Sequence, residues 1–202
     1  MISLKNICKS YGEKTLFDKL NLDIGDGEFV VFAGKSGCGK TTLLNMIGGL
    51  EKPDNGTVLV DGKDIFKRNN MRKYFTETVG FLFQNFALVE DETVIKNLEY
   101  VQKKFRDEKS SDEILNYLGL LDKRNTKVYK LSGGEQQRVA IARLMYKKCK
   151  IILADEPTGS LDSENARLVM KTLHDLNDLG KTIVLVTHSE KIIANEKRVI
   201  NL

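Results

Sequence analysis

The sequence predicts an α/β fold in which a parallel β-sheet is covered by helices on both faces. Three short segments are largely apolar on both faces, as strands inside such a sheet are, and they span residues 29–33, 151–154 and 182–186. Segments with helical periodicity separate these strands, and strands that alternate with helices indicate a parallel sheet. A glycine-rich loop and a short apolar helix follow the first strand directly.

Composition narrows the class of protein. Of 202 residues, 41% are hydrophobic and 30% are charged, which is typical of a soluble globular protein. The 32 Lys and Arg against 28 Asp and Glu leave a net charge of +4, which is too mild for a dedicated nucleic-acid binder. We therefore expect no nucleic-acid partner.

The sequence shows no sign of a membrane span or a secretory leader. The longest apolar run covers residues 29–33, whereas a membrane-spanning helix needs about 20 apolar residues. No positively charged segment with an apolar core opens the chain. Cys8, Cys38 and Cys149 are odd in number and lack metal-ligand spacing, so we expect neither a disulfide framework nor zinc. We expect a cytosolic protein with reduced thiols, held at a membrane only by a partner.

The N-terminal segment alternates apolar and polar side chains, as Leu20, Leu22 and Ile24 illustrate, and this alternation is typical of strands. A proline-containing turn at residues 53–56 precedes a further strand. Together with the N-terminal strands, the region near residues 57–82 is expected to form a small antiparallel β region.

The middle of the chain changes to helical periodicity. Val94, Leu98, Val101 and Phe105 recur at helical spacing. Two capping boxes start further helices; they pair Ser110 with Glu113 and Ser132 with Glu135.

The last third returns to alternating strands and helices. Ser163 is expected to cap a helix that ends at Gly180, and residues 198–202 are expected to form an edge strand.

We therefore predict one domain over residues 1–202. Its core and β subdomain would comprise residues 1–86 and 149–202, and a helical subdomain of about residues 87–148 would be inserted between them.

The glycine-rich loop carries the first chemical motif. From Gly34 to Thr41 the sequence reads G-K-S-G-C-G-K-T, which fits G-x-x-x-x-G-K-[ST]. In this pattern the backbone N–H groups surround a phosphate, Lys40 reaches the outer phosphates and the Thr41 hydroxyl binds Mg²⁺. We therefore expect a P-loop NTPase core. The residues expected to contact the nucleotide here are Gly34, Lys35, Ser36, Gly37, Cys38, Gly39, Lys40, Thr41 and Thr42.

Two adjacent carboxylates, Asp155 and Glu156, end the apolar strand at residues 151–154. Successive side chains on a strand point to opposite sides, so the two carboxylates can take different roles. One can hold Mg²⁺ while the other faces the attacking water.

A third motif resembles a known family. Residues 131–137 read L-S-G-G-E-Q-Q, and R-V-A-I-A-R follows; this segment resembles the signature motif of ATP-binding-cassette ATPases. Other family elements occur in the same order along essentially the whole chain: Tyr11 resembles the aromatic residue that stacks on adenine, Gln84 the Q-loop glutamine, Asp162 the D-loop aspartate and His188 the switch histidine. The interval from Lys40 to Ser132 has no room for a long coiled coil, which argues against the chromosome-maintenance and double-strand-break branches.

The resemblance implies an ATPase that uses ATP and Mg²⁺. Glu156 would be the general base, aided by Lys40, Gln84 and His188, and the metal would be held by Thr41, Gln84 and Asp155. In an ATP-dependent head-to-tail homodimer, further nucleotide contacts would come from Ser132, Gly133, Gly134, Glu135 and Asp162. Two of these residues also have a simpler structural interpretation. Ser132 can be a helix N-cap, and Tyr11 can be an aromatic residue at the end of a strand.

The resemblance also implies a partner. We expect the energy-supplying subunit of a transporter, which docks on a separate membrane permease through residues 84–98 and lies at the inner face of the cell membrane. The segment at residues 83–94 is similar to the branch that serves antimicrobial-peptide or bacteriocin export, macrolide export and lipoprotein release. The alternative is a scaffold of the same fold that controls a membrane regulator of cell-wall hydrolysis and moves no cargo. A small-molecule P-loop kinase would have no use for residues 131–137.

Overall fold

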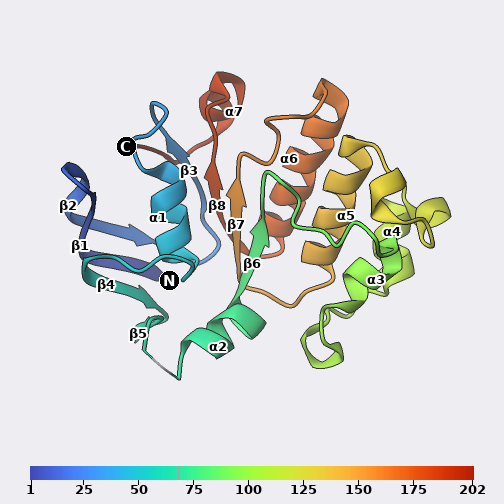
Figure 1. Ribbon diagram of the computed structural model, residues 1–202, viewed down its shortest axis with the longest axis horizontal. Helices are drawn as coiled ribbons and strands as arrows, with labels where there is room; N and C mark the ends of the chain where they lie inside the picture. The colour runs from blue at the N-terminus through green and yellow to red at the C-terminus, as the bar shows by residue number, and fades with distance from the viewer. Residues whose placement is uncertain (68) are drawn as a thin grey trace.

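The computed structural model describes residues 1–67 and 69–202. Its centre is a parallel sheet of five strands in the order β6-β7-β8-β3-β9 (Figure 1). The strands are β6 (Val79–Leu82), β7 (Ile151–Asp155), β8 (Thr182–Val186), β3 (Phe29–Ala33) and β9 (Val199–Asn201). The predicted buried strands and the predicted edge strand are thereby confirmed.

A second, antiparallel sheet has the order β2-β1-β4-β5. Its strands are β1 (Ile2–Tyr11), β2 (Lys14–Ile24), β4 (Asn55–Val60) and β5 (Lys63–Asp64). The prediction that this region extends to residue 82 is wrong, because β6 pairs in parallel with β7. Gly80 lets β6 lie close to Leu144, since a Cβ at this position would lie 2.4 Å from Leu144 Cδ1.

Helices cover both faces of the parallel sheet (Figure 1). They are α1 (Lys40–Ile47), α2 (Met71–Lys73), α3 (Val94–Glu99), α4 (Ser111–Tyr117), α5 (Gly133–Met145), α6 (Ser163–Asp178) and α7 (Glu190–Asn195). Helix α1 lies between the two sheets, and α5 and α6 pack on the opposite face with α3 and α4 beyond them. The expected α/β fold is confirmed. The division at residues 86 and 149 stays a prediction.

The parallel sheet separates two apolar cores. One core joins the sheet to α1 and the antiparallel sheet, and the other joins it to α3, α4, α5 and α6. Because strand side chains alternate, neighbouring residues serve different cores: Val31 belongs to the core on the α5 side, whereas Phe32 belongs to the core on the α1 side.

Helix α3 is shorter than its periodicity predicts. It ends at Glu99, and residues 103–105 form a separate 3₁₀ turn. The Arg106 guanidinium stabilises this break, because its Nε donates to the Val101 carbonyl (2.8 Å) and its Nη2 to the Glu99 carbonyl (3.2 Å). The helical spacing of Val101 and Phe105 therefore does not reflect a continuous helix.

The caps of the later helices are largely as predicted. Both capping boxes, at Ser110 and Ser132, are present. The predicted cap of α6 is wrong by one residue, because Asp162 accepts the Asn165 N–H and Ser163 is the first helical residue. Among residues 1–67 and 69–202, no helix has the length and apolar character needed to cross a bilayer.

Candidate functional site

The predicted motifs meet at one edge of the parallel sheet. Parallel strands present their carboxyl ends at the same edge, which is where ligands bind in open α/β folds. Four neighbouring strands deliver a functional segment each: β6 leads to Gln84, β7 to Asp155 and Glu156, β8 to His188, and β3 to the loop at residues 34–39.

Glycines set the shape of the loop at residues 34–39 and leave its backbone uncovered. Gly39 directly precedes α1 in a left-handed conformation (φ 104°), and a Cβ there would lie 2.7 Å from Phe17 Cζ. Gly34 is similarly confined, since a Cβ would lie 2.7 Å from the Leu202 carbonyl oxygen. Only glycine combines a left-handed backbone with the absence of a Cβ. The backbone N–H groups at the start of α1 therefore remain open to an anion.

Lys40 is the first residue of α1, and its buried side chain turns back into this loop. Its Nζ donates to the carbonyl oxygens of Gly34 (2.8 Å) and Lys35 (3.0 Å). A cavity of about 240 Å³ opens beside it, and its lining comprises Leu16, Ser36, Gly37, Gly39, Lys40, Thr41, Thr42, Glu156 and Val186. The loop and a strand-end carboxylate therefore face one space.

Thr41 and Asp155 bring two hard oxygen donors together. The Thr41 hydroxyl donates to Asp155 Oδ1 at 3.2 Å. Burial raises the pKa of the Asp155 carboxyl, the adjacent Glu156 raises it further, and the Thr41 hydrogen bond and the Lys40 charge oppose both effects. A cation at this position would favour the ionised carboxylate.

Glu156 adopts a left-handed backbone conformation (φ 45°) directly after β7. Its carboxylate is held on both oxygens: His188 Nδ1 lies 2.8 Å from Oε1, and the Thr187 hydroxyl donates to Oε2 at 3.3 Å. The Glu156 side chain is only 15% exposed, whereas that of His188 is 73% exposed. The carboxylate is therefore fixed at the cavity wall while the imidazole faces outward.

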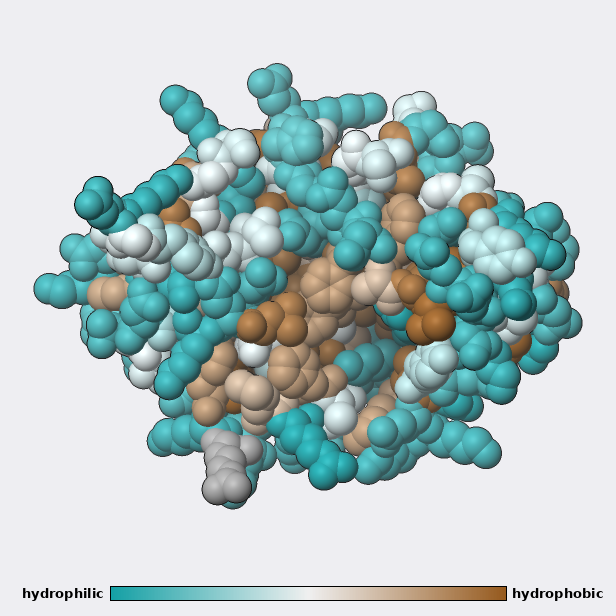
Figure 2. All heavy atoms as spheres, in the orientation of Figure 1, coloured by the Kyte–Doolittle hydropathy of each residue, from teal (hydrophilic) through white to brown (hydrophobic). Residues whose placement is uncertain are grey.

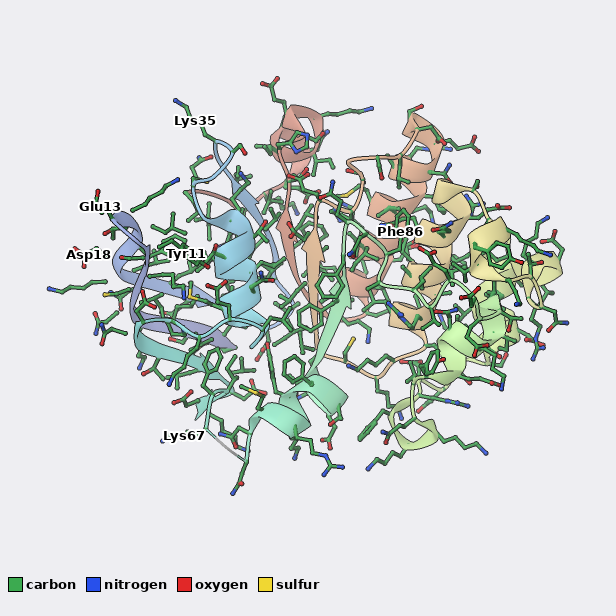
Figure 3. All side chains as sticks on the ribbon, in the orientation of Figure 1. Tyr11, Glu13, Asp18, Lys35, Lys67 and Phe86 are labelled. Carbon is green, nitrogen blue, oxygen red and sulfur yellow. The ribbon has the colours of Figure 1, made fainter. Side chains whose placement is uncertain are left out.

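Tyr11 lies outside the phosphate cavity, between the antiparallel sheet and α1 (Figure 3). Its ring is 49% exposed, and its hydroxyl donates to the Glu51 carboxylate. That hydrogen bond is the main reason why the pKa of the Tyr11 phenol is raised. Lys9 Nζ lies 2.9 Å from Glu51 and 5.1 Å from the Tyr11 ring centroid. An exposed ring held at its edge suits stacking against a flat group.

Ser132 and its neighbours do not line the phosphate cavity of their own chain. Ser132 is exposed at the start of α5, where its hydroxyl accepts the Glu135 N–H (3.3 Å) and Glu135 Oε2 accepts the Ser132 N–H (2.8 Å). Gly133 is exposed, and Gly134 packs tightly against Asn165, which the Asp162 carboxylate also binds. The Asn165 N–H lowers the pKa of Asp162. These residues form a second, separate surface.

Four contacts of the site were not foreseen from the sequence. Lys14 Nζ donates to the Gly37 carbonyl (2.9 Å), Glu51 orients Tyr11, Thr187 binds Glu156, and Gln137 donates to the Pro157 carbonyl (2.8 Å). Thr187 directly precedes His188 just after the end of β8, so its position in the sequence could have predicted that it belongs to the site. The other three contacts join segments far apart in the sequence and leave no local pattern.

A glycine-rich loop with the P-loop sequence pattern, at the edge of a parallel sheet and beside paired carboxylates, is the arrangement of P-loop nucleotide-binding proteins. A family model described as ABC transporter matches residues 17–159. The chain belongs to this ABC transporter family, as the sequence resemblance indicated.

Named relatives agree with this assignment. The chain is 44% identical over its whole length to the macrolide export ATP-binding/permease protein MacB of Campylobacter jejuni, of which it covers 33%. It is 39% identical, again over its whole length, to the lipoprotein-releasing system ATP-binding protein LolD of Bacteroides thetaiotaomicron, of which it covers 96%. The chain thus spans about a third of the macrolide-export relative and nearly all of the lipoprotein-release relative.

A solved structure shares the fold. The chain resembles the dimeric post-hydrolysis state of the ATP-binding cassette MJ0796 bound to ADP and Pi, with 38% identity and a TM-score of 0.85. The match covers 100% of this chain and 94% of that one.

Proposed function

We propose that this chain binds and hydrolyses ATP as the energy-supplying subunit of a membrane transporter. The observation that carries the proposal is the cavity that Lys40, Thr41 and Glu156 line together. Asp155 lies beside it, hydrogen-bonded to Thr41, and the signature-like segment lies on a separate surface of the chain. Lys40 would exchange its loop carbonyls for the outer phosphates of ATP, and the loop N–H groups would hold the β-phosphate.

The residues around the loop fit Mg²⁺. Thr41 and Asp155 offer hydroxyl and carboxylate oxygens 3.2 Å apart, and Mg²⁺ is commonly bound by one or two such groups together with substrate phosphates and water. Within the part of the chain that the structure describes, no three His, Cys, Asp or Glu side chains form a metal cage. Thr41, Gln84 and Asp155 would hold the ion, which when bound would neutralise phosphate charge.

Glu156 is the proposed general base. Its carboxylate lies in the cavity wall, where it would orient water in line with the γ-phosphate and accept its proton. His188 holds one carboxylate oxygen through Nδ1, so its imidazole is placed to stabilise the charge that develops during transfer.

We further propose an ATP-dependent head-to-tail homodimer. Ser132, Gly133, Gly134, Glu135 and Asp162 lie outside their own phosphate cavity, and a partner's nucleotide would give them a ligand. The dimeric state of the similar cassette supports this arrangement. ATP would then act as a ligand that favours the closed dimer, and hydrolysis would remove that preference.

The proposed docking surface for a permease is an apolar groove that neighbours the predicted contact segment at residues 84–98. The groove measures about 340 Å³ and is lined by the turn that follows α2, by β6, by the segment after α3 and by the end of α5 (Figure 2). Its lining comprises Phe75, Thr76, Gly80, Phe81, Phe83, Tyr100, Val101, Gln102, Phe105, Arg143, Leu144 and Lys147. A permease from the macrolide-export or lipoprotein-release class is the partner that the named relatives favour, with an antimicrobial, peptide or lipoprotein-type cargo.

Glu156→Gln tests the proposed chemistry. The amide keeps the shape of the carboxylate but cannot accept the proton, so turnover should fall by at least about a hundredfold while ATP still binds. With MgATP the variant should accumulate as a dimer, measured by light scattering. Normal turnover by a monomeric variant would contradict both the base and the dimer.

A further inference from the structure

Gln137 joins α5 to the residue that follows the proposed base. Its side chain is only 1% exposed, and its Nε2 donates to the Pro157 carbonyl oxygen at 2.8 Å. A carbonyl oxygen can only accept, so the amide must turn its NH₂ group toward Pro157. The contact therefore requires a donor at this position and not merely a side chain of suitable size.

The backbone at Glu156 needs such support. A left-handed conformation (φ 45°) is disfavoured for any residue other than glycine, because Cβ crowds the following carbonyl. Here it turns the chain away from the line of β7 and brings the carboxylate to His188. On the near side, the Glu156 N–H donates to the Val186 carbonyl at 2.9 Å. At the next residue, the Gln137 side chain binds the Pro157 carbonyl. The left-handed residue therefore has one hydrogen bond at its own N–H and another at the carbonyl of the residue that follows it.

The amide of Gln137 is not there for packing alone. Among the residues that the structure describes, its Oε1 is one of the few buried side-chain atoms that lack a hydrogen-bond partner. An apolar side chain of the same volume would fill this space without burying an unpaired oxygen. The Nε2 bond to Pro157 is the interaction that only an amide at this position supplies.

We propose that Gln137 is a positioning residue, which holds the turn after β7 so that the Glu156 carboxylate faces the γ-phosphate. This inference rests on the proposed function. Gln137 also connects the cavity wall at Glu156 with the separate surface around Ser132, because it lies on the helix whose N-cap is Ser132. Movement of α5 on dimer closure would then act directly on the placement of the base.

Gln137→Met provides the test in the full chain, because methionine has a similar reach and cannot donate. Turnover should fall roughly tenfold to a hundredfold, as small misplacements of a reacting group do. The affinity for MgATP should change by less than about twofold, since no nucleotide contact is removed. Gln137→Asn keeps the amide but shortens it, so it should show the same selective loss and serves if the methionine variant is unstable.

Thr172→Val is the matched control. Thr172 is fully buried, and its hydroxyl donates to the Leu168 carbonyl at 2.9 Å within α6. The substitution also deletes a buried hydrogen bond and should lower the melting temperature, but it should leave turnover unchanged. An equal loss of turnover in Thr172→Val and Gln137→Met would mean that general destabilisation is the cause, and would overturn the inference.

A double-mutant cycle separates positioning from stability. In the Glu156→Gln background there is no base to place, so adding Gln137→Met should not slow single-turnover hydrolysis further. The same fold-loss in both backgrounds would overturn the role assigned to Gln137. Wild-type chain that fails to hydrolyse ATP would instead overturn the proposed function. Hydrolysis by wild type, its loss in Glu156→Gln and full turnover in Gln137→Met would overturn the inference alone.

Discussion

Lys40 and Tyr11 lie in different parts of the proposed nucleotide site. Substitution of Lys40 should therefore mainly lower turnover, whereas substitution of Tyr11 should mainly lower the affinity for ATP. Lys40→Ala removes the ammonium that lies within the loop and should lower turnover by at least about a hundredfold. Tyr11→Ala removes an exposed stacking surface worth about 1–3 kcal/mol. It should weaken ATP binding by roughly tenfold to a hundredfold, with little change in turnover at saturation. Nucleotide titration and steady-state kinetics give both quantities, and unchanged ATP affinity in Tyr11→Ala would remove Tyr11 from the site.

Cys38 makes the loop sensitive to alkylation. Its side chain is half-buried, and its Sγ lies 3.8 Å from Lys40 Nζ. A small alkylating reagent should therefore place bulk at the proposed phosphate site and inactivate the ATPase, and MgATP should protect. Cys149 is buried, which raises the pKa of its thiol and makes it a poor competitor for the reagent.

Cys38→Ala is the control for this reaction. It should keep activity, because the proposed phosphate contact uses the backbone N–H at this position, and it should lose sensitivity to the reagent. Inhibition of Cys38→Ala at the wild-type rate would place the reactive thiol elsewhere, with Cys8 the other half-buried candidate.

At the scale of elements, α5 also holds the segment after β6. Arg143 in its last turn donates to the carbonyl oxygens of Ala87 (2.6 Å) and Phe86 (3.2 Å). Both residues have left-handed backbone (φ 48° and 62°), and Figure 3 shows Phe86 beside α5. Burial lowers the pKa of Arg143. In the part of the chain that the structure describes, no carboxylate pairs with this guanidinium.

Arg143→Ala should lower the free energy of unfolding by about 1–3 kcal/mol, because it removes two hydrogen bonds from a charged donor to backbone carbonyls. Adding Ala87→Gly should restore part of this loss, since glycine accepts the left-handed conformation without strain. Urea denaturation measures both effects. If Ala87→Gly changes the free energy of unfolding by the same amount in the Arg143→Ala background as in wild type, the strain is not held by the guanidinium.

Local patterns predicted the elements that depend on local chemistry. β3, β7 and β8 are continuous apolar segments, and the phosphate loop is a contiguous motif whose glycines have a direct steric role. The assignment of β6 failed because the sheet it joins is decided by β7, which lies far along the chain. The predicted extension of α3 failed because Arg106, which lies beyond the helix, binds the carbonyl oxygen of its last residue, Glu99, and that of Val101 just after it.

The same distinction applies to the candidate site. The residues Lys40, Thr41, Asp155 and Glu156 lie in or next to recognisable motifs. In the structure Lys40, Thr41 and Glu156 line one cavity, and Asp155 is hydrogen-bonded to Thr41. The contacts of Glu51 with Tyr11 and of Gln137 with Pro157 depend on how separate elements pack, so no residue spacing reveals them. The nucleotide roles of these residues stay proposals that the substitutions above test.

At the scale of the whole molecule, the proposed permease groove should be separable from the ATPase. Tyr100 lines the groove and is 58% exposed, so Tyr100→Ala should remove apolar contact area without disturbing the core. Binding to the co-purified permease should weaken by roughly tenfold, typical of an aromatic anchor, while the ATPase rate of the isolated chain stays the same. Tyr129→Ala, at a residue 51% exposed and outside the groove, is the matched control. Equal effects of both variants on permease binding would argue against this surface.

The alternation of core residues along β3 gives experimenters a pair of adjacent reporters. A methyl label on Val31 senses the side of the sheet that carries α5 and the signature-like segment, and a ring label on Phe32 senses the side that carries α1 and the phosphate loop. Because one peptide bond separates the two probes, both report the same overall tumbling and differ only in the core that they sense. A nucleotide-dependent change seen at Val31 but not at Phe32 would therefore report that the two halves of the molecule respond at different steps of the ATP cycle.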